Sequence, residues 1–140
     1  MVFQLQFDMR SVNWDMVTDI LKTVGMAHYT STIHQRAFEN SNTVVFAFDH
    51  EQLVGFGRAI SDGAYQAAIY DLAVLPAYQG KGIGKVLLQH LVAQNPGCNF
   101  ILYASPGKEL FYEKSNFKRL KTGMALFVNA DRMQEKGFIY

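Results

Sequence analysis

Residues 79–85 read Gln79-Gly80-Lys81-Gly82-Ile83-Gly84-Lys85, with three alternate glycines and two lysines in seven positions. It lies between an apolar run at 67–75, which is typical of a strand, and a helical pattern that begins near Ile83. The first turn of a helix leaves backbone N–H groups unpaired and carries a partial positive charge. Lys81 and Lys85 add formal positive charge. The stretch therefore predicts a binding site for a phosphate-bearing ligand.

Two common phosphate loops are excluded by their spacing. A Walker A loop ends in Gly-Lys-Ser/Thr, whereas Gly84-Lys85 precedes Val86, and Gln79 stands where its first glycine belongs. A dinucleotide fingerprint needs a third glycine where Lys85 stands, and an acidic residue about twenty positions further on. No acidic residue occurs between Lys85 and Lys108.

The pattern Gln-x-x-Gly-x-Gly after the apolar run resembles the acetyl-CoA-binding signature of the GCN5-related N-acetyltransferase (GNAT) superfamily. Residues 111–117, Phe-Tyr-Glu-Lys-Ser-Asn-Phe, resemble the late Phe-Tyr-x-x-x-Gly-Phe segment of that family. With the neighbouring strands, the resemblance covers residues 54–128. Residues 58–65 and 69–71 are also similar, more weakly, to the plant and cyanobacterial branch that includes serotonin N-acetyltransferases.

Size and composition fit a single globular domain over residues 1–140. The hydrophobic fraction is 49% and the formal net charge is +1, which gives no reason to expect a nucleic acid or an anionic membrane as partner. The single cysteine, Cys98, suits a reducing compartment. No cluster has metal-ligand spacing and no segment has the length of a membrane span, so we expect no metal and a cytoplasmic location.

The order of predicted elements indicates a mixed α/β fold with helices against the sheet. The GNAT resemblance implies the same order, with a mixed, mostly antiparallel central sheet and helices packed on both faces. Strands are expected at 3–7, 43–48, 52–60, 66–75, 99–104 and 123–128. Helices are expected at 14–24, at 30–39, from 83 to the Asn-Pro-Gly stop at 95–97, and from 106 to 116. For the last of these helices, Ser105 is expected as the cap and Pro106 in the first turn, and Asn116 is expected to end the helix in a left-handed conformation.

The resemblance implies acetyl transfer from acetyl-CoA, by direct transfer in a ternary complex. It assigns the diphosphate to the backbone around residues 79–85, and the pantetheine arm to the strand that precedes the loop, where a backbone N–H would also stabilise the oxyanion. The residues so implied are Leu72, Ala73, Val74, Gln79, Gly80, Lys81, Gly82, Ile83, Gly84 and Lys85. The alternative for the loop is a tight turn without a ligand. The side chain of Gln79 is either a ligand contact or a loop brace.

The same resemblance makes Tyr112 the general acid. A phenol with a pKa near 10 stays protonated at neutral pH and is able to donate its proton to a thiolate. The alternative is a core aromatic residue beside Phe111. Asn116 departs from the glycine that the family uses there, and this affects the turn rather than the phenol.

The general base is open among a carboxylate, a histidine and water. Asp71 lies on the strand before the loop, and strand alternation places it on the opposite face from its neighbours. Burial in a cleft would raise its pKa, whereas the alternative is a hydrogen-bonded structural carboxylate. His28 and His34 lie in the variable region that forms the acceptor wall in the family, and each is alternatively a packed or exposed side chain.

The similarity to the plant and cyanobacterial branch implies an aromatic or aliphatic primary amine as acceptor. The variable region has no acidic cluster that would suit a peptide, so a small molecule is expected. A protein or peptide acceptor and a non-catalytic acetyl-CoA-binding module are the alternatives. With an aromatic or aliphatic amine, the wall residues would come from among Trp14, Tyr29, Phe38 and Tyr65. The aromatic segment 138–140 would dock on its own domain or on a second subunit of a homodimer.

Overall fold

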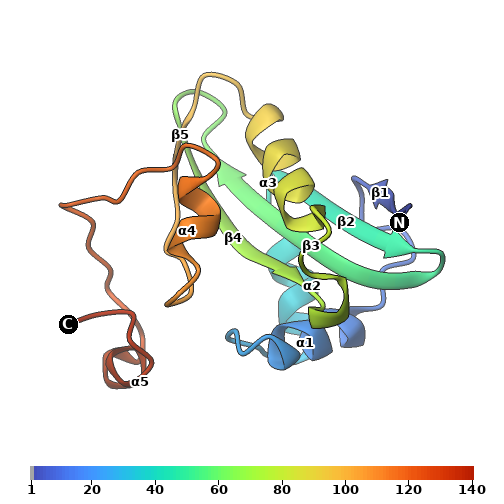
Figure 1. Cartoon of the computed structure of the whole chain (residues 1–140), viewed down its shortest axis with the longest axis horizontal. Coiled ribbons are helices and arrows are strands. Elements are labelled where there is room, and N and C mark those ends of the chain that lie inside the picture. Colours follow the sequence, from blue (N-terminus) through green and yellow to red (C-terminus); the bar gives the residue numbers. More distant parts are fainter. Residues whose placement is uncertain (1) are drawn as a thin grey trace. The chain divides into compact units, whose positions relative to one another are not determined.

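A computed structural model of the chain describes residues 2–140 (Figure 1). Internal contacts divide these residues into two compact units, which are described separately. The sheet unit ends at Leu102, and the C-terminal unit is Tyr103–Tyr140. The sheet unit contains the glycine loop and Asp71, whereas Tyr112 belongs to the C-terminal unit.

The sheet unit is built on a sheet whose strands follow the chain order. They are β1 (Gln4–Gln6), β2 (Thr43–Asp49), β3 (Gln52–Ser61), β4 (Gln66–Val74) and β5 (Asn99–Ile101). Neighbouring strands are antiparallel except for β4 and β5, which are parallel. The predicted mixed, mostly antiparallel sheet is therefore confirmed. β5 ends at Ile101, three residues before the predicted end of that strand.

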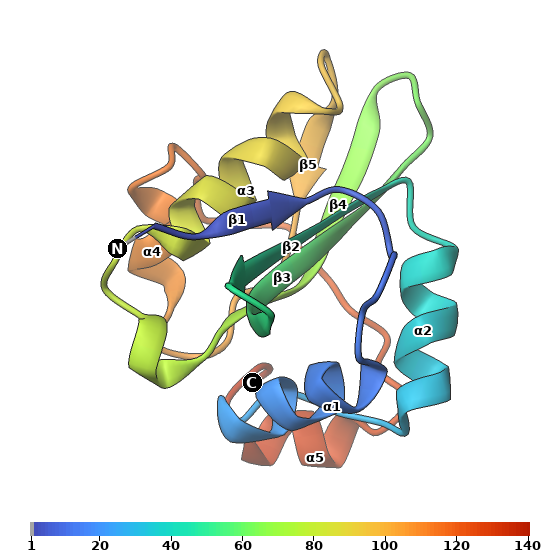
Figure 2. The same ribbon diagram turned by 90° about the vertical axis from the view of Figure 1, so that its right-hand side faces the viewer.

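Helices cover both faces of this sheet, as the sequence predicted (Figure 2). Helices α1 (Trp14–Thr23) and α2 (Ser31–Glu39) lie on one face, and α3 (Ile83–Ala93) lies on the other. α1 begins where the side chain of Asn13 accepts hydrogen bonds from the N–H groups of Asp15 and Met16. The core on the α1/α2 face is aromatic: the rings of Phe38 and Phe46 lie 5.5 Å apart.

The α3 face is aliphatic, and close packing against β3 fixes the position of the helix. A Cβ added to Gly57 would lie 2.9 Å from Leu72 Cδ1 and 3.1 Å from Leu91 Cδ1. A Cβ at this position would force the ends of these two leucine side chains to shift, so glycine allows their close approach to β3. The residues of α3 buried on this face are Ile83, Leu87, Leu88 and Leu91. This packing holds the N-terminus of α3 directly after the end of β4.

The C-terminal unit contains two short helices, α4 (Glu109–Glu113) and α5 (Ala130–Glu135). The predicted helix start at Ser105 and Pro106 is wrong, because Gly107 adopts a left-handed conformation with φ +89° and α4 begins after Lys108. The predicted left-handed Asn116 is confirmed, with φ +69°. The N–H groups of Asn116 and Phe117 bond back to the carbonyls of Glu113 and Tyr112, which closes the end of α4.

The predicted strand at 123–128 is wrong. These residues form no strand, and their alternating apolar side chains are in solvent instead: Met124 is 98% exposed and Leu126 is 102% exposed. The alternation is that of a strand, but a strand forms only when a neighbour accepts its backbone hydrogen bonds. The ring of Phe127 is the exception, and it packs edge-on against Tyr103 at 5.4 Å.

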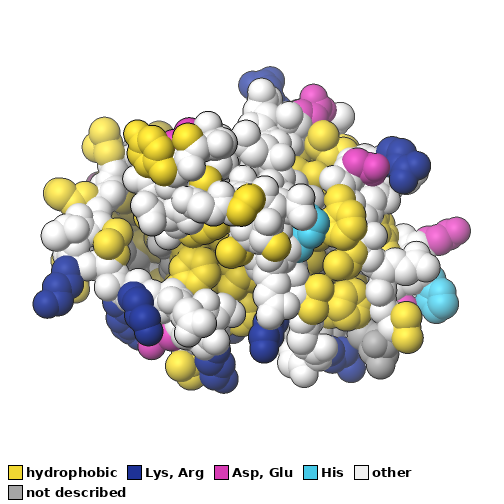
Figure 3. Space-filling model, turned by 90° about the horizontal axis from the view of Figure 1, so that it is seen from above, with side chains coloured by type: hydrophobic (Ala, Val, Ile, Leu, Met, Phe, Trp, Pro, Cys, Tyr) yellow, Lys and Arg dark blue, Asp and Glu magenta, His cyan; other side chains and the backbone are white. Residues whose placement is uncertain are grey.

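Charged side chains form no extended single-sign surface on the face drawn in Figure 3. Hydrophobic side chains are exposed across this face, and acidic and basic groups lie mostly at its margins. Among residues 2–140 there is no helix long and apolar enough to cross a membrane.

Candidate functional site

The glycine loop connects β4 to α3 through a single 3₁₀ turn, η1 (Pro76–Tyr78). Gly80 and Gly82 both adopt left-handed backbone conformations, with φ +77° and +85°. Gly82 is the N-cap residue of α3, and an ideal Cβ at either glycine would meet no atom within 4 Å. Glycine is therefore required here by the backbone conformation and not by packing within the chain.

The backbone N–H groups of residues 80–85 have no acceptor within residues 2–140. The hydrogen bonds of α3 begin with Val86, whose N–H bonds to the carbonyl of Gly82 at 3.2 Å. The loop is exposed except for the buried side chain of Ile83 and the half-buried Gly84. A consecutive run of unpaired, exposed amides at a helix N-terminus suits an anionic ligand.

The side chains of this loop divide into a brace and two free cations. Gln79 Nε2 donates to the carbonyl of Val74 at 2.9 Å, so its side chain ties the loop to the end of β4. This contact agrees with the prediction that Gln79 acts as a loop brace. Lys81 and Lys85 are exposed, and no ion pair of either is found within the described chain. Their charges add to the positive end of the α3 dipole.

The edge of β4 that faces β5 is unpaired over its second half. β4 pairs with β5 only at Gln66–Ala68, whereas it pairs with β3 as far as Val74. Leu75 N–H bonds to the carbonyl of Val54 in β3 at 2.8 Å. Because backbone groups alternate along a strand, the N–H groups of Leu72 and Val74 face the unpaired edge, and that of Ala73 faces β3.

A β-bulge at Asp71 interrupts β4 immediately before these residues. The register with β3 shifts between Phe56 and Arg58, so that Gly57 lies opposite both Asp71 and Leu72. Asp71 has φ +56°, and the alternation expected for its side chain is therefore broken. Its Oδ2 accepts a hydrogen bond from Arg58 Nε at 2.8 Å, and both side chains are largely buried.

Arg58 is the site residue that the sequence analysis missed. Its guanidinium contacts Ser41 Oγ at 3.3 Å and lies 5.8 Å from the ring of Phe38 and 5.2 Å from the ring of Tyr70. Arg58 and Asp71 are thirteen positions apart in sequence, and the register places them together because Arg58 is opposite Tyr70. An Arg and an Asp on strands joined by a hairpin are the signal that could have found this pair.

The histidines differ in their surroundings. His34 in α2 is buried, and its Nε2 accepts the N–H of Tyr29 at 2.8 Å. Burial lowers the pKa of His34, and the charge of Asp71 opposes this in part. His28 is exposed, with Nδ1 3.1 Å from the carbonyl of Met26. Of the two, His34 is the one electrostatically coupled to Asp71 and Arg58.

The expected wall residues do not share one environment. Phe38 is fully buried and packs at 5.5 Å from Trp14 and 5.8 Å from Phe56, so it is a core residue and the prediction for it is wrong. Trp14 is half-buried beside it. Tyr29 and Tyr65 are exposed, at 56% and 65%.

Tyr112 lies in α4 within the C-terminal unit, where its ring packs edge-on against Phe111 at 5.0 Å and Phe117 at 5.9 Å. Burial raises the pKa of its phenol above the ordinary value of 10. The phenol is therefore protonated at neutral pH, which is the state that a proton donor requires.

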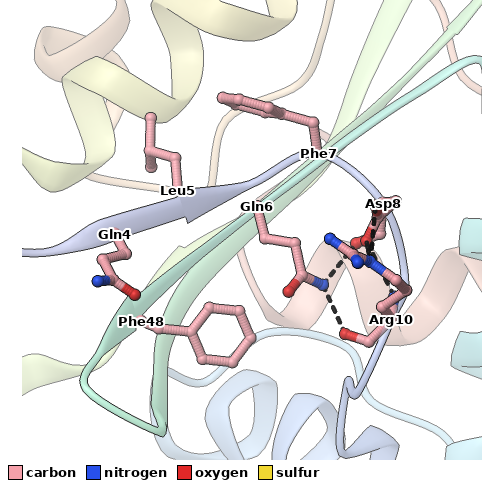
Figure 4. Close-up of a pocket in the computed structure, with 7 residues that line it drawn as sticks. All are labelled: Gln4, Leu5, Gln6, Phe7, Asp8, Arg10 and Phe48. Carbon is pink, nitrogen blue, oxygen red and sulfur yellow. Dashed lines mark hydrogen bonds and ion pairs between the residues drawn. The ribbon is translucent and has the colours of Figure 1, made fainter.

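A hollow of about 270 Å³ lies elsewhere in the sheet unit, beside β1 (Figure 4). Gln6 crosses it, and its Nε2 donates to the carbonyls of Asp8 and Arg10. Arg10 is paired with Asp8 at 3.1 Å. These polar groups satisfy one another, and no predicted site residue lines the hollow. No group of three or more potential metal ligands occurs in the described part of the chain.

The sheet unit thus combines amides without acceptors at the N-terminus of α3 with an unpaired edge of β4. The comparisons identify the family. Residues 40–119 match the acetyltransferase (GNAT) domain model, which is more than half of the chain. The chain therefore belongs to the GNAT acetyltransferase family, and the resemblance inferred from residues 72–84 and 111–117 is confirmed.

Curated relatives include proteins with different named acceptors. The chain is 29% identical to "Serotonin N-acetyltransferase 2, chloroplastic" of Oryza sativa subsp. japonica over 128 residues, 84% of this chain and 64% of that protein. It is 37% identical to "Histone acetyltransferase TAP1" of Glycine max over 73 residues, 50% of this chain and 32% of that protein. The chain spans between 51% and 64% of the length of three further relatives named as N-acetyltransferases.

A solved structure agrees with the fold. The crystal structure of a Staphylococcus aureus protein described as a probable acetyltransferase superposes with a TM-score of 0.81 at 22% identity, and the match covers 91% of this chain and 99% of that one. At this identity the likeness supports the fold alone.

Proposed function

We propose that this chain is an acetyl-CoA-dependent N-acetyltransferase that acts on a primary amine of a small molecule. Family membership supports acetyl transfer. The observation that carries the choice of donor is the run of unpaired N–H groups at residues 80–85, flanked by Lys81 and Lys85. A diphosphate supplies enough acceptor oxygens for several of these amides at once, and its charge suits the helix N-terminus.

The unpaired edge of β4 supports a place for the pantetheine arm, which carries amide groups like those of a peptide. Extended amide-bearing ligands bind by adding to an exposed sheet edge. The N–H groups of Leu72 and Val74 face this edge, whereas the carbonyl of Val74 is already bonded to Gln79. In this proposal Ala73 contributes through its place in β4, and not through backbone pairing.

Bound acetyl-CoA would supply an activated acetyl thioester, and the protein would move protons around it. We assign the acid to Tyr112, because burial keeps its phenol protonated. The base is less directly supported. Asp71 Oδ2 already accepts a hydrogen bond from Arg58 Nε, and this contact equally fits a structural carboxylate. Asp71, His34 and water therefore all stay in the proposal as candidates.

A small-molecule acceptor is favoured by what surrounds Asp71. The nearby groups are Arg58, the buried His34 and aromatic rings. These groups do not provide the acidic edge that would attract a basic peptide segment. A protein acceptor is the second candidate, and a module that binds acetyl-CoA without turnover is the third.

Calorimetric titration with coenzyme A, followed by a thiol-release assay, tests the proposal. We expect saturable binding, and thiol release from acetyl-CoA with at least one amine in a panel of aromatic amines, aliphatic amines, amino sugars and lysine-bearing peptides. Binding without release for any amine would favour the non-catalytic module. Release only with peptides would favour the protein acceptor. A folded protein that does not bind coenzyme A would contradict the proposal itself.

A further inference from the structure

The bulge at Asp71 is held by an ion pair whose contacts link β3, β4 and α2 of the sheet unit. Arg58 Nε in β3 bonds to Asp71 Oδ2 in β4 at 2.8 Å. The guanidinium also bonds to Ser41, which follows α2 and donates in turn to the carbonyl of Ala37 at 2.7 Å. The Arg58 side chain is 15% exposed and that of Asp71 is 22% exposed, so water screens the pair only in part.

The conformation of Asp71 needs such support. A residue with a Cβ is unfavourable at φ +56°, although aspartate tolerates the left-handed region better than most. A strained residue inside a strand persists only when its surroundings fix it. The planar guanidinium lies over the Phe38 and Tyr70 rings and is bonded at two of its nitrogens, so it is a rigid support of this kind.

The bulge lies where β4 ceases to pair with β5. Pairing ends at Ala68, the bulge follows at Asp71, and the edge residues Leu72 and Val74 come directly after it. A bulge bends its strand and increases the local twist. Loss of the bulge would shift the register by one residue and exchange which amides face the open edge. The orientation of the Leu72 and Val74 amides therefore depends on the Arg58–Asp71 pair.

We propose that Arg58 is a positioning residue for the donor site: its ion pair with Asp71 fixes the bulge that presents the Leu72 and Val74 amides to the pantetheine arm of the coenzyme. This inference rests on the proposed function. It predicts that the glycine loop binds the phosphates of the coenzyme, and that loss of the Arg58–Asp71 pair weakens binding of the pantetheine arm without changing binding of the phosphates.

Two probes separate these parts: coenzyme A, and its 3′-phosphorylated ADP portion, which has the phosphates but lacks the arm. For Arg58→Gln and Asp71→Asn we expect about a tenfold weaker affinity for coenzyme A, as for the loss of one or two hydrogen bonds. Affinity for the fragment is expected to be unchanged. Arg58→Lys keeps the charge and should recover part of the loss. Arg10→Gln breaks an exposed Arg–Asp pair instead, and should leave both affinities as in the unmodified protein.

Equal weakening of both probes, or of neither, would overturn the role of Arg58. Failure of the unmodified protein to bind either probe would instead contradict the proposed function. If the Gln and Asn variants do not fold, amide hydrogen exchange of the unmodified protein decides. Coenzyme A, but not the fragment, should then protect the Leu72 and Val74 amides. Amides protected before addition, or unprotected after it, would refute the inference.

Discussion

The sheet unit and the C-terminal unit differ most in what they bury. Every side chain of the hydrophobic core in the described chain belongs to the sheet unit, from Val17 to Leu91. The C-terminal unit instead leaves Leu120, Met124, Leu126 and Val128 between 65% and 109% exposed. Yet Tyr112, the proposed acid, belongs to this second unit. The buried core that stabilises the fold therefore lies in the sheet unit, whereas the proposed function assigns the acid to the other unit.

The largest expected effect tests where the stability lies. Phe38→Ala removes a fully buried ring that packs among Trp14, Phe46 and Phe56. It should lower the free energy of unfolding by about 3–5 kcal/mol. Leu126→Ala in the C-terminal unit removes a fully exposed side chain and should change it by less than about 0.5 kcal/mol. Urea denaturation followed by circular dichroism measures both. Similar losses in the two variants would show that residues 123–128 are buried in solution.

The second prediction asks whether the C-terminal unit contributes to the chemistry. Tyr112→Phe keeps the ring and its contacts with Phe111 and Phe117 but removes the phenolic proton. The rate of thiol release should fall by about 10²-fold or more, as for loss of a general acid. The affinity for coenzyme A should stay the same. Tyr140→Phe removes an exposed phenol from the same unit as a control. Undiminished turnover in the Tyr112 variant would leave this tyrosine with a packing role only.

The third prediction returns to the sheet unit and separates backbone strain from ligand binding. Gly82→Ala places a Cβ at φ +85° and should cost about 1–2 kcal/mol of stability. Gly97→Ala is the control with the same backbone strain, since Gly97 has φ +79° and an added Cβ there would also meet no atom within 4 Å. Only the Gly82 change should weaken coenzyme A binding, by about 10- to 100-fold, because it disturbs amides that bond to charged oxygens. Equal affinities in the two variants, measured by calorimetry, would argue against the loop as the phosphate site.

The same contrast explains how far the sequence could predict the structure. In the sheet unit, the spacing of the hydrophobic residues and the positions of the turn residues indicate the same helix boundaries. The predicted helices at 14–24 and 30–39 therefore match α1 and α2 closely. In the C-terminal unit, the alternation at 123–128 indicated a strand. Alternation encodes what a strand would bury, but not whether a neighbouring strand is available to pair with it. Helix α5 was missed, although Asn129 caps it by accepting the N–H of Arg132.

Within the site, local features were predictable and long-range ones were not. The loop at 79–85 is a contiguous motif, and glycine at positions 80 and 82 is the residue type that favours the left-handed backbone conformation found there. The Arg58–Asp71 pair depends on the register of β3 against β4, and a bulge shifts this register by one residue. Aspartate at φ +56° has no sequence signature comparable to glycine. The wrong prediction for Phe38 has a similar origin, because an aromatic residue in the acceptor region packs in the core or lines a wall with the same local pattern.

The smallest expected effect concerns pH and the α2 side of the sheet unit. Burial lowers the pKa of His34 in the folded protein, whereas the unfolded chain has the ordinary value of about 6.5. Below that pH the unfolded state binds more protons than the folded one, so the contribution of His34 is complete above about pH 6.5 and declines as the pH falls. Asp71 opposes this shift, while Arg58 and His28 add to it.

Denaturation midpoints between pH 8 and 5 should therefore fall less steeply for His34→Gln than for the unmodified protein. Because His90 also has a pKa lowered by burial, some decline should remain in that variant. Identical slopes would mean that folding does not lower the pKa of His34, which would contradict its burial with Nε2 accepting the N–H of Tyr29.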